Sequence, residues 1–288
     1  MAENLGSILT AMVTPFDADG NVDEDAAVAL MHHLVEHGSD GLVICGTTGE
    51  ASTLDDEEHL GVIRLAVEEM GDDCTVVAGV GSNDTRHAIY LTERATEIGP
   101  DALLHVNPYY NRPSRRGIVR HYEEICRATD LPILLYNIPQ RTGSDMSNDL
   151  LAELAQLDNI FAVKQANAAN LAKIDGMQIY AGNDDLLADV LDLGEPGGVL
   201  VASHLFGEEM HRMVDEPERR REIDASLKDV YADMPVAPLA CATKAALHLL
   251  GLLPCAMPRL PYVELDEQEL DVIRAMLERH LLLQATRA

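Results

Sequence analysis

Eight short apolar segments alternate with longer amphipathic segments along this chain of 288 residues. This alternation predicts an α/β fold, a (β/α)8 TIM barrel, with a C-terminal helical extension. Continuous apolar runs suit parallel strands that are buried on both faces, and the chain exceeds the roughly 250 residues that such a barrel takes. An open, doubly wound sheet is the structural alternative, because a count of strands and helices does not show that the sheet closes.

The predicted strands are apolar and short, and several predicted helices begin at a capping residue. Asp23, Asp55 and Asp84 are of the N-cap type, and helix ends are expected at Gly38, Gly71, Gly99 and Gly194. The strands are expected at residues 8–13, 41–45, 75–79, 102–106, 132–136, 160–164, 178–181 and 198–201. The helices between them are expected at residues 23–37, 55–70, 84–98, 114–129, 147–157, 170–174 and 184–193.

The residues that follow the eighth strand are expected to form helices that pack on the barrel. Helical patterns occur there at residues 218–232, 236–250 and 266–286. We therefore expect a barrel core at residues 1–207, and the last barrel helix with the C-terminal helical extension at residues 208–288. No linker or low-complexity tract separates the two parts.

The composition excludes several classes of function. The 21 Lys and Arg residues against 49 Asp and Glu residues give a formal net charge of −28, whereas nucleic-acid binding needs clustered basic side chains. No apolar run reaches the roughly eighteen residues of a membrane span. The five cysteines are odd in number and scattered, which is typical of reduced thiols. We expect a cytoplasmic protein that binds neither nucleic acid nor a membrane.

Chemically useful side chains follow the predicted strands. In a (β/α)8 barrel the catalytic residues lie at the carboxyl ends of the strands. The second strand is followed by a Gly-Thr-Thr-Gly-Glu turn at residues 46–50, and the fourth by two adjacent tyrosines. The fifth strand ends at Tyr136, with Arg141 soon after it, and the sixth ends at Lys164. These side chains are therefore expected to meet at one rim of the barrel.

Lys164 is the most informative of these residues. It closes an apolar strand in a chain that has only four lysines. Burial lowers the pKa of a lysine and populates the neutral amine, which attacks carbonyl groups to form a Schiff base. A single lysine at a strand end can instead lie along the surface or pair with a carboxylate. The hydroxyl groups expected nearby favour the Schiff base.

Tyr136 and two threonines can assist such chemistry. Tyr136 is expected one strand away from Lys164, where a phenol can pass protons to and from the intermediates. Thr47 and Thr48 lie in a turn whose N–H groups and hydroxyls can bind a carboxylate. Each pattern is weak alone, because tyrosines at strand ends and Gly-Thr-Thr-Gly turns are common.

Three other patterns are better explained as ordinary structure. The acidic stretch at residues 17–23 has its glycine in the wrong place for a calcium loop. His33 and His37 share a helix face but lack a third metal ligand. The Gly-Val-Gly sequence at residues 79–81 lacks the other features of a dinucleotide site. We therefore expect no metal and no organic cofactor.

Seven motifs are spread over nearly the whole chain. They are Thr-Ala-Met-Val-Thr-Pro-Phe at 10–16, Gly-Thr-Thr-Gly-Glu at 46–50, Pro-Tyr-Tyr-Asn-Arg-Pro at 108–113, Tyr-Asn-Ile-Pro at 136–139, Val-Lys at 163–164, Gly-Asn-Asp-Asp at 182–185 and Arg-Leu-Pro-Tyr at 259–262. Together they resemble the Schiff-base-forming barrels of the dihydrodipicolinate synthase and N-acetylneuraminate lyase superfamily.

The resemblance implies roles for five residues. Lys164 would form the imine with pyruvate, and Tyr136 with Thr48 would belong to a proton relay. Thr47 and Thr48 would hold the pyruvate carboxylate. Tyr110 would complete the relay from a neighbouring subunit, which implies a homo-oligomer with a dimer as the minimal unit and a tetramer as the expected assembly. The family needs no metal or organic cofactor.

Two further residues bear on the substrates that the resemblance implies. Gly182 would line the pocket, and Arg141 matches the residue that binds the carboxylate of aspartate 4-semialdehyde in the synthases. We therefore expect condensation of pyruvate with this aldehyde to 4-hydroxy-tetrahydrodipicolinate, on the route to diaminopimelate and lysine. A 2-keto-3-deoxygluconate-type aldolase or other pyruvate-dependent lyase is one alternative, and a non-catalytic metabolite-binding barrel is another.

The resemblance also bears on regulation. His59, Asn83 and Tyr109 match the lysine-sensing site of inhibited members, whereas Asp56 and His87 stand where those members usually have a histidine and a glutamate. The carboxylate that would pair with the ammonium group of lysine is thereby lost. We expect weak or absent inhibition by lysine.

Overall fold

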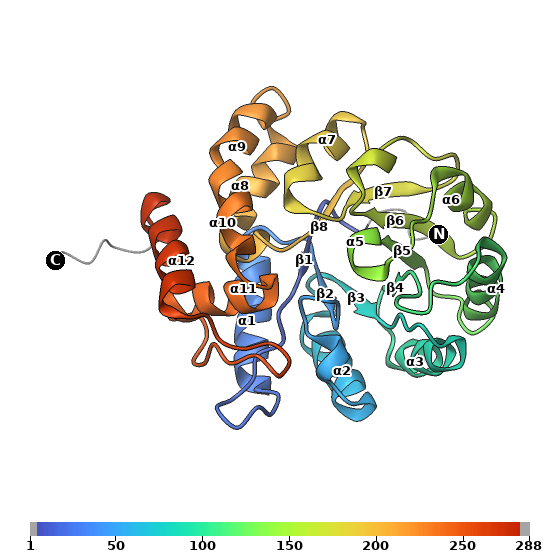
Figure 1. The fold of residues 1–288 in the computed structure, drawn as a ribbon, viewed down its shortest axis with the longest axis horizontal. Coiled ribbons are helices and arrows are strands. Elements are labelled where there is room, and N and C mark those ends of the chain that lie inside the picture. The colour runs from blue at the N-terminus through green and yellow to red at the C-terminus, as the bar shows by residue number, and fades with distance from the viewer. Residues whose placement is uncertain (1–4, 283–288) are drawn as a thin grey trace.

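The computed structural model describes residues 5–282 and contains a closed barrel. The eight strands are parallel and hydrogen-bonded in chain order, with β1 paired to β8 (Figure 1). The open, doubly wound sheet is therefore excluded. The strands are β1 Ile8–Ala11, β2 Gly41–Ile44, β3 Thr75–Gly79, β4 Ala102–Val106, β5 Ile133–Asn137, β6 Ile160–Gln165, β7 Gln178–Ala181 and β8 Gly197–Leu200.

Helices surround the barrel and continue beyond it. The α-helices are α1 Glu24–Glu36, α2 Asp56–Met70, α3 Thr85–Ile98, α4 Arg115–Cys126, α5 Pro139–Thr142, α6 Asn148–Leu154, α7 Leu187–Asp192, α8 Ser203–Asp215, α9 Arg220–Ser226, α10 Lys228–Asp233, α11 Leu239–Leu249 and α12 Glu267–Arg279. Short 3-10 helices are η1 Ala51–Thr53, η2 Ala168–Asn170, η3 Asp184–Leu186 and η4 Met234–Val236. At α2, Asp55 and Glu58 form the capping box that begins the helix.

Both faces of the sheet are buried, as the continuous apolar strands predict. On β3, Val77 packs inside the barrel, whereas Val76 and Ala78 pack against the surrounding helices. On β4, Leu104 points inward and Leu103 outward. Successive side chains of a strand point to opposite faces, so a strand enclosed by the barrel core and the helix layer is apolar at every position.

The eighth barrel helix differs from the expectation. The sequence analysis predicts no helix between the eighth strand and residue 218, but α8 begins at Ser203, soon after β8. The helix is interrupted at Phe206, whose φ and ψ are −132° and 33°. At Gly207 a Cβ atom would lie 2.3 Å from the carbonyl oxygen of His37. This close packing requires glycine and disturbs the helical pattern of the sequence. The expected boundary between residues 207 and 208 falls inside α8.

Other helix boundaries also need correction. The expected helix at 218–232 is divided into α9 and α10 at Leu227, whose ψ of 2° is not helical. The helix expected at 170–174 is wrong, because the chain there forms only the short η2, which ends at Asn170. α11 begins only after Pro238, which cannot donate a backbone hydrogen bond. The helix expected at 266–286 ends at Arg279, and the part of that prediction beyond residue 282 lies outside the described residues.

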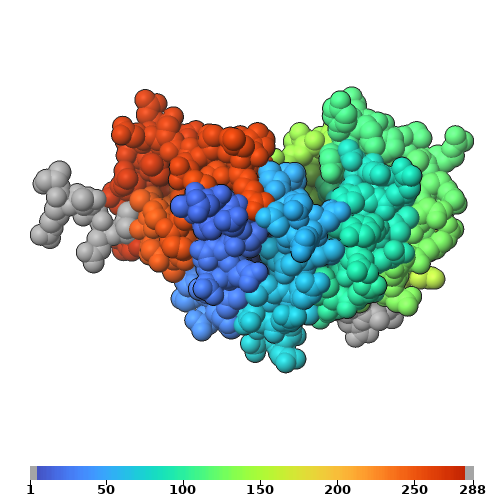
Figure 2. Space-filling model, turned by 90° about the horizontal axis from the view of Figure 1, so that it is seen from below, coloured from blue at the N-terminus to red at the C-terminus, as the bar shows by residue number. Residues whose placement is uncertain are grey.

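The C-terminal helices pack beside the N-terminal segments of the chain. Figure 2 shows the orange and red C-terminal part against the dark blue N-terminal part. α11 contacts both α8 and α12, so the extension is continuous with the helix layer of the barrel. Within residues 5–282, no helix has the length and apolar character that a membrane span needs.

Candidate active site

Lys164 and Tyr136 lie side by side at the carboxyl ends of β6 and β5. The two residues are direct partners in the strand register. Each has only 5% of its surface exposed. The Nζ atom of Lys164 lies over the phenol ring of Tyr136, 4.3 Å from the ring centroid. The structure thus brings together the two residues that the strand ends predict as the chemical centre.

Burial shifts the pKa of both groups. It lowers the pKa of Lys164 to about 7, an effect that the nearby carboxylate of Asp184 opposes and the guanidinium of Arg141 reinforces. A substantial fraction of this amine is therefore uncharged at neutral pH, which is the form that attacks a carbonyl group. Burial raises the pKa of Tyr136 to about 12, so its phenol keeps its proton.

Asp184 is a residue of this site to which the sequence analysis gives no role. Its carboxylate accepts hydrogen bonds from the N–H groups of Val201, at 2.8 Å, and Ala202, at 3.0 Å. Burial raises the pKa of this carboxyl group, and the two N–H donors act against that rise. Asp184 thereby joins the segment after β7 to the start of α8, and its negative charge favours the ammonium form of Lys164.

An amide network lies behind the two central residues. Asn137 follows Tyr136 on β5, and Gln165 follows Lys164 on β6. The side-chain amide of Asn137 donates a hydrogen bond to the side-chain oxygen of Gln165 at 3.0 Å. Asn137 also donates to Asp145 at 2.9 Å and accepts from the N–H group of Met146 at 3.0 Å. Because Asn137 and Gln165 are fully buried, these bonds fix β5 and β6 relative to each other.

Lys164 lines a small cavity of about 50 Å³, and most of the predicted site residues surround it. Thr47, Thr48, Tyr136, Arg141 and Gly182 all belong to its wall. The wall also contains residues to which the sequence analysis gives no role, namely Ile138, Asn183, Val201, Leu239, Ala240 and Tyr262. Tyr262 lies in a motif that the sequence analysis identifies. Leu239 and Ala240 lie on α11, and no sequence pattern indicates that this helix reaches the site.

Gly182 is required at its position by close packing. A Cβ atom there would lie 2.7 Å from the backbone N of Ala166 and 2.8 Å from the backbone carbon of Gln165. These contacts involve backbone atoms just after Lys164, so a larger residue would displace β6 or β7. Gly182 therefore keeps the end of β7 close to the lysine strand.

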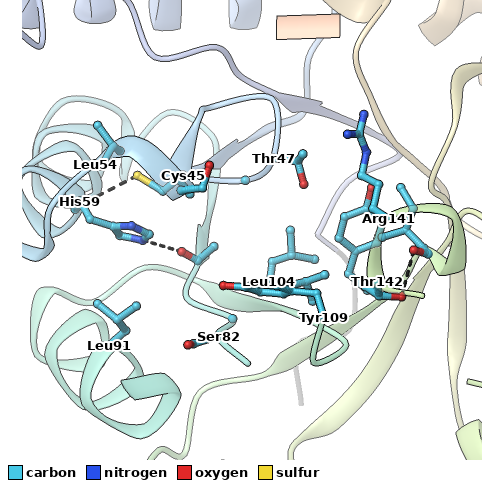
Figure 3. Close-up of a pocket in the computed structure, with 18 of the residues that line it drawn as sticks. Cys45, Thr47, Leu54, His59, Ser82, Leu91, Leu104, Tyr109, Arg141 and Thr142 are labelled. Carbon is cyan, nitrogen blue, oxygen red and sulfur yellow. Dashed lines mark hydrogen bonds between the residues drawn. The ribbon is translucent and has the colours of Figure 1, made fainter. Parts of the chain in front are cut away.

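A larger cavity of about 430 Å³ adjoins the small one and shares part of its wall. Thr47, Tyr136, Arg141 and Tyr262 line both cavities. Figure 3 shows Thr47 and Arg141 on one side of the larger cavity and His59 on the other. Arg141 is exposed at this junction, where its guanidinium can meet a carboxylate that enters from the larger cavity.

Four of the five residues that bear on lysine sensing, Asp56, His59, His87 and Tyr109, line the larger cavity, and Asn83 donates a hydrogen bond to the carbonyl oxygen of Tyr109 at 3.1 Å. His59 is buried, and its Nε2 atom is hydrogen-bonded to the carbonyl oxygen of Gly79 at 2.7 Å. Burial lowers the pKa of His59. Asp56 and His87, the two positions that depart from the family pattern, pair with each other at 2.9 Å. The carboxylate of Asp56 is thus already bound to a neighbour.

Tyr110 lies apart from the other predicted site residues. Its side chain is 89% exposed, its φ is +68°, and it lines neither cavity of its own chain. Such a backbone conformation is uncommon for a non-glycine residue, and the high exposure shows that the ring has little contact with its own chain. A role for Tyr110 in catalysis requires a second chain.

Comparisons with known proteins agree with this arrangement. The model of the dihydrodipicolinate synthetase family matches residues 4–280. A 4-hydroxy-tetrahydrodipicolinate synthase of Desulforudis audaxviator is 39% identical over 98% of this chain and 100% of its own.

Solved structures give the same result. The dihydrodipicolinate synthase of Acinetobacter baumannii, complexed with pyruvate, is 33% identical, with a TM-score of 0.93 over 97% of this chain and 100% of its own. The enzyme of Cyanidioschyzon merolae, with lysine bound, is 37% identical, with a TM-score of 0.92 over 97% of this chain and 99% of its own. The chain therefore belongs to the dihydrodipicolinate synthetase family.

Proposed function

We propose that the protein is an enzyme that condenses pyruvate with aspartate 4-semialdehyde to 4-hydroxy-tetrahydrodipicolinate. The observation that carries this proposal is the buried amine of Lys164, which has a pKa of about 7 and faces a cavity. The choice of substrates rests on the names of relatives that align over almost the whole chain. The same reaction places the enzyme in lysine and diaminopimelate biosynthesis.

The proposed reaction uses Lys164 as the nucleophile. Its neutral Nζ adds to the keto carbon of pyruvate, and loss of water gives an iminium ion. Loss of a proton from the methyl group gives an enamine, whose carbon attacks the aldehyde of the second substrate. The amino group of that substrate then attacks the imine carbon, which closes the ring and releases the lysine.

The side chains around Lys164 have separate tasks in this proposal. Tyr136, with its phenol protonated, donates a proton to the departing hydroxyl group and takes one back in later steps. Thr47 and Thr48 bind the pyruvate carboxylate through hydroxyl and N–H donors. Arg141 binds the carboxylate of aspartate 4-semialdehyde at the junction of the two cavities.

We also propose that the enzyme works as a homo-oligomer, as a tetramer built from dimers. Tyr110 is 89% exposed and Tyr109 is 38% exposed, and large exposed aromatic side chains are typical of protein interfaces. In a dimer, Tyr110 can extend the proton relay of the partner chain.

The five cysteines are free thiols, which supports a reducing, cytoplasmic location.

Replacement of Lys164 tests the nucleophile. The wild-type protein treated with pyruvate and borohydride is expected to gain one reduced pyruvyl adduct on the peptide that contains Lys164, because borohydride reduces the imine to a stable amine. Lys164→Ala is expected to form no adduct, whereas Lys173→Ala, at an exposed lysine, is expected to retain it. Peptide mass spectrometry measures both. An adduct on another lysine, or none in the wild type, would disprove the proposed nucleophile.

The pH dependence tests the protonation state of the amine. Burial lowers the pKa of Lys164 from 10.5 to about 7, and only the neutral form attacks pyruvate. The rate of imine formation is therefore expected to rise as the pH increases through about 7 and to level off above it. The rate of imine formation would be measured by rapid mixing and trapping between pH 5.5 and pH 9, in steps of about half a pH unit. A midpoint near that of an ordinary lysine would contradict the proposal.

Replacement of Arg141 tests the second substrate. Arg141→Ala is expected to retain the pyruvate adduct and to raise the KM for aspartate 4-semialdehyde about tenfold or more, because it removes a charged partner of the carboxylate. Arg94→Ala, which removes an exposed arginine of α3, is the matched control. Wild-type cleavage of 2-keto-3-deoxygluconate to pyruvate, with no turnover of aspartate 4-semialdehyde, would favour the aldolase alternative.

Lysine is expected to inhibit the enzyme weakly or not at all. Asp56 is already paired with His87 at the edge of the larger cavity, and no glutamate occupies position 87 to bind the ammonium group of an effector. Steady-state rates with and without millimolar lysine measure this directly. A clear loss of activity in millimolar lysine would refute this prediction.

A further inference from the structure

Glu50 is a buried carboxylate at the end of the turn that carries Thr47 and Thr48. Its side chain is fully buried, and its backbone is left-handed, with a φ of +55°. Its carboxylate accepts a hydrogen bond from the Nζ atom of Lys244 and another, at 2.9 Å, from the N–H group of Arg259. A buried charge of this kind is stable only with such partners.

Both partners of Glu50 belong to the C-terminal extension. Lys244 lies on α11, where its side chain is also fully buried, and Arg259 lies in the loop that follows. Lys244 donates a second hydrogen bond to the carbonyl oxygen of Met257 at 3.1 Å. The Nζ atom of Lys244 and the guanidinium of Arg259 both lie over the ring of Phe16, at 4.0 Å and 4.4 Å from its centroid.

Arg259 connects the same loop to the rim of the barrel. Its guanidinium donates to the carbonyl oxygens of Gly20, at 2.7 Å, and Thr53, at 2.9 Å, and it pairs with Glu58 at the start of α2. The extension therefore contacts the segment that includes the threonine turn at both Glu50 and Thr53. These contacts join residues about two hundred positions apart in the sequence.

The same extension reaches the cavity of Lys164. Ala240 of α11 lines that cavity, and Lys244 lies one helical turn later on the same face of the helix. Tyr262, three residues after Arg259, lines it as well. The C-terminal extension thus forms part of the wall of the cavity and also contacts the turn that contributes Thr47 and Thr48.

The turn needs external support because its backbone is strained. Cys45 and Glu50, at its two ends, both have left-handed φ values, of +56° and +55°. Non-glycine residues keep such conformations only where the surrounding contacts enforce them. On the barrel side, Thr14 donates a hydrogen bond to the carbonyl oxygen of Gly49 at 2.6 Å. On the side of the C-terminal extension, the turn is supported by the ion pair of Glu50 with Lys244.

We propose that Lys244 and Glu50 are positioning residues for the pyruvate carboxylate. Their buried ion pair connects the C-terminal extension to the turn at residues 46–50 and fixes the conformation of that turn. It thereby fixes the hydrogen-bond donors of Thr47 and Thr48. This inference rests on the proposed function above. It makes the extension part of the catalytic unit, because the geometry of the carboxylate subsite depends on α11.

Two variants separate positioning from stability. Lys244→Met leaves the carboxylate of Glu50 buried without its cation, so this variant is expected to be poorly stable. The double variant Glu50→Gln, Lys244→Met removes both charges, and neutral replacement of a buried ion pair is often tolerated. The amide oxygen that Glu50→Gln introduces can still accept a hydrogen bond from the backbone N–H group of Arg259. Lys173→Met, at an exposed lysine, is the matched control.

The decisive readout is the affinity for pyruvate. The folded double variant, checked by circular dichroism and gel filtration, is expected to show a KM for pyruvate raised about tenfold, with a smaller change in kcat. The pyruvate concentration that gives half-maximal borohydride trapping should rise by the same factor. The control should match the wild type. A purely structural ion pair would lower the melting temperature but leave both values unchanged, and that result would overturn the inference.

A measurement on the wild-type protein decides the matter even if the variants do not fold. Hydrogen–deuterium exchange is compared before and after the pyruvate adduct is trapped with borohydride. Slower exchange is expected in residues 46–50 and also in residues 242–250 and 257–259, which belong to the C-terminal extension but do not line the cavity of Lys164. Protection confined to residues 46–50 would overturn the inference. The absence of any adduct in the wild type would instead refute the proposed function, so the two failures are distinguishable.

Discussion

The chemistry of this site depends on the removal of one amine from water. Lys164 lies near the end of a strand whose other residues pack against the barrel core and the helix layer, so only 5% of its surface is exposed and its side chain borders a small cavity. The loss of hydration disfavours the ammonium form and brings its pKa close to neutrality. Asp184 limits this effect, because its negative charge stabilises the ammonium form. The pKa of Lys164 therefore results from a balance between burial and the charge of Arg141, which lower it, and the carboxylate of Asp184, which raises it.

The surrounding structure keeps that amine in a fixed position. The side chains of Asn137 and Gln165 join β5 and β6 directly behind Tyr136 and Lys164. The close approach of Gly182 to the backbone after Lys164 holds β7 against the same strand. A nucleophile is efficient when its partners are held in place before the substrate binds, and these contacts act on backbone segments rather than on flexible side chains.

Local signals in the sequence account for most of the fold and for part of the site. All eight strands were predictable within about two residues, because a strand enclosed on both faces is apolar at each position. Lys164, Tyr136 and the two threonines could be identified because strand ends of a barrel meet at one rim. The helix α8 was missed, since its interruption at Phe206 and Gly207 follows from packing against the segment after α1. The contribution of α11 was also missed, because Lys244 and Glu50 meet across 194 positions and neither has a local pattern that reveals the contact.

The shared wall of the two cavities has a consequence for selectivity. Thr47, Tyr136 and Arg141 line both spaces, so a molecule in the wide outer space faces these three side chains before it reaches the lysine. The narrow inner space suits a small keto acid, whereas the outer space has room for a longer chain. A bifunctional compound with a keto acid at one end and a polar tail would occupy both compartments at once. The discrimination between such compounds would occur at the boundary between the compartments rather than at the nucleophile.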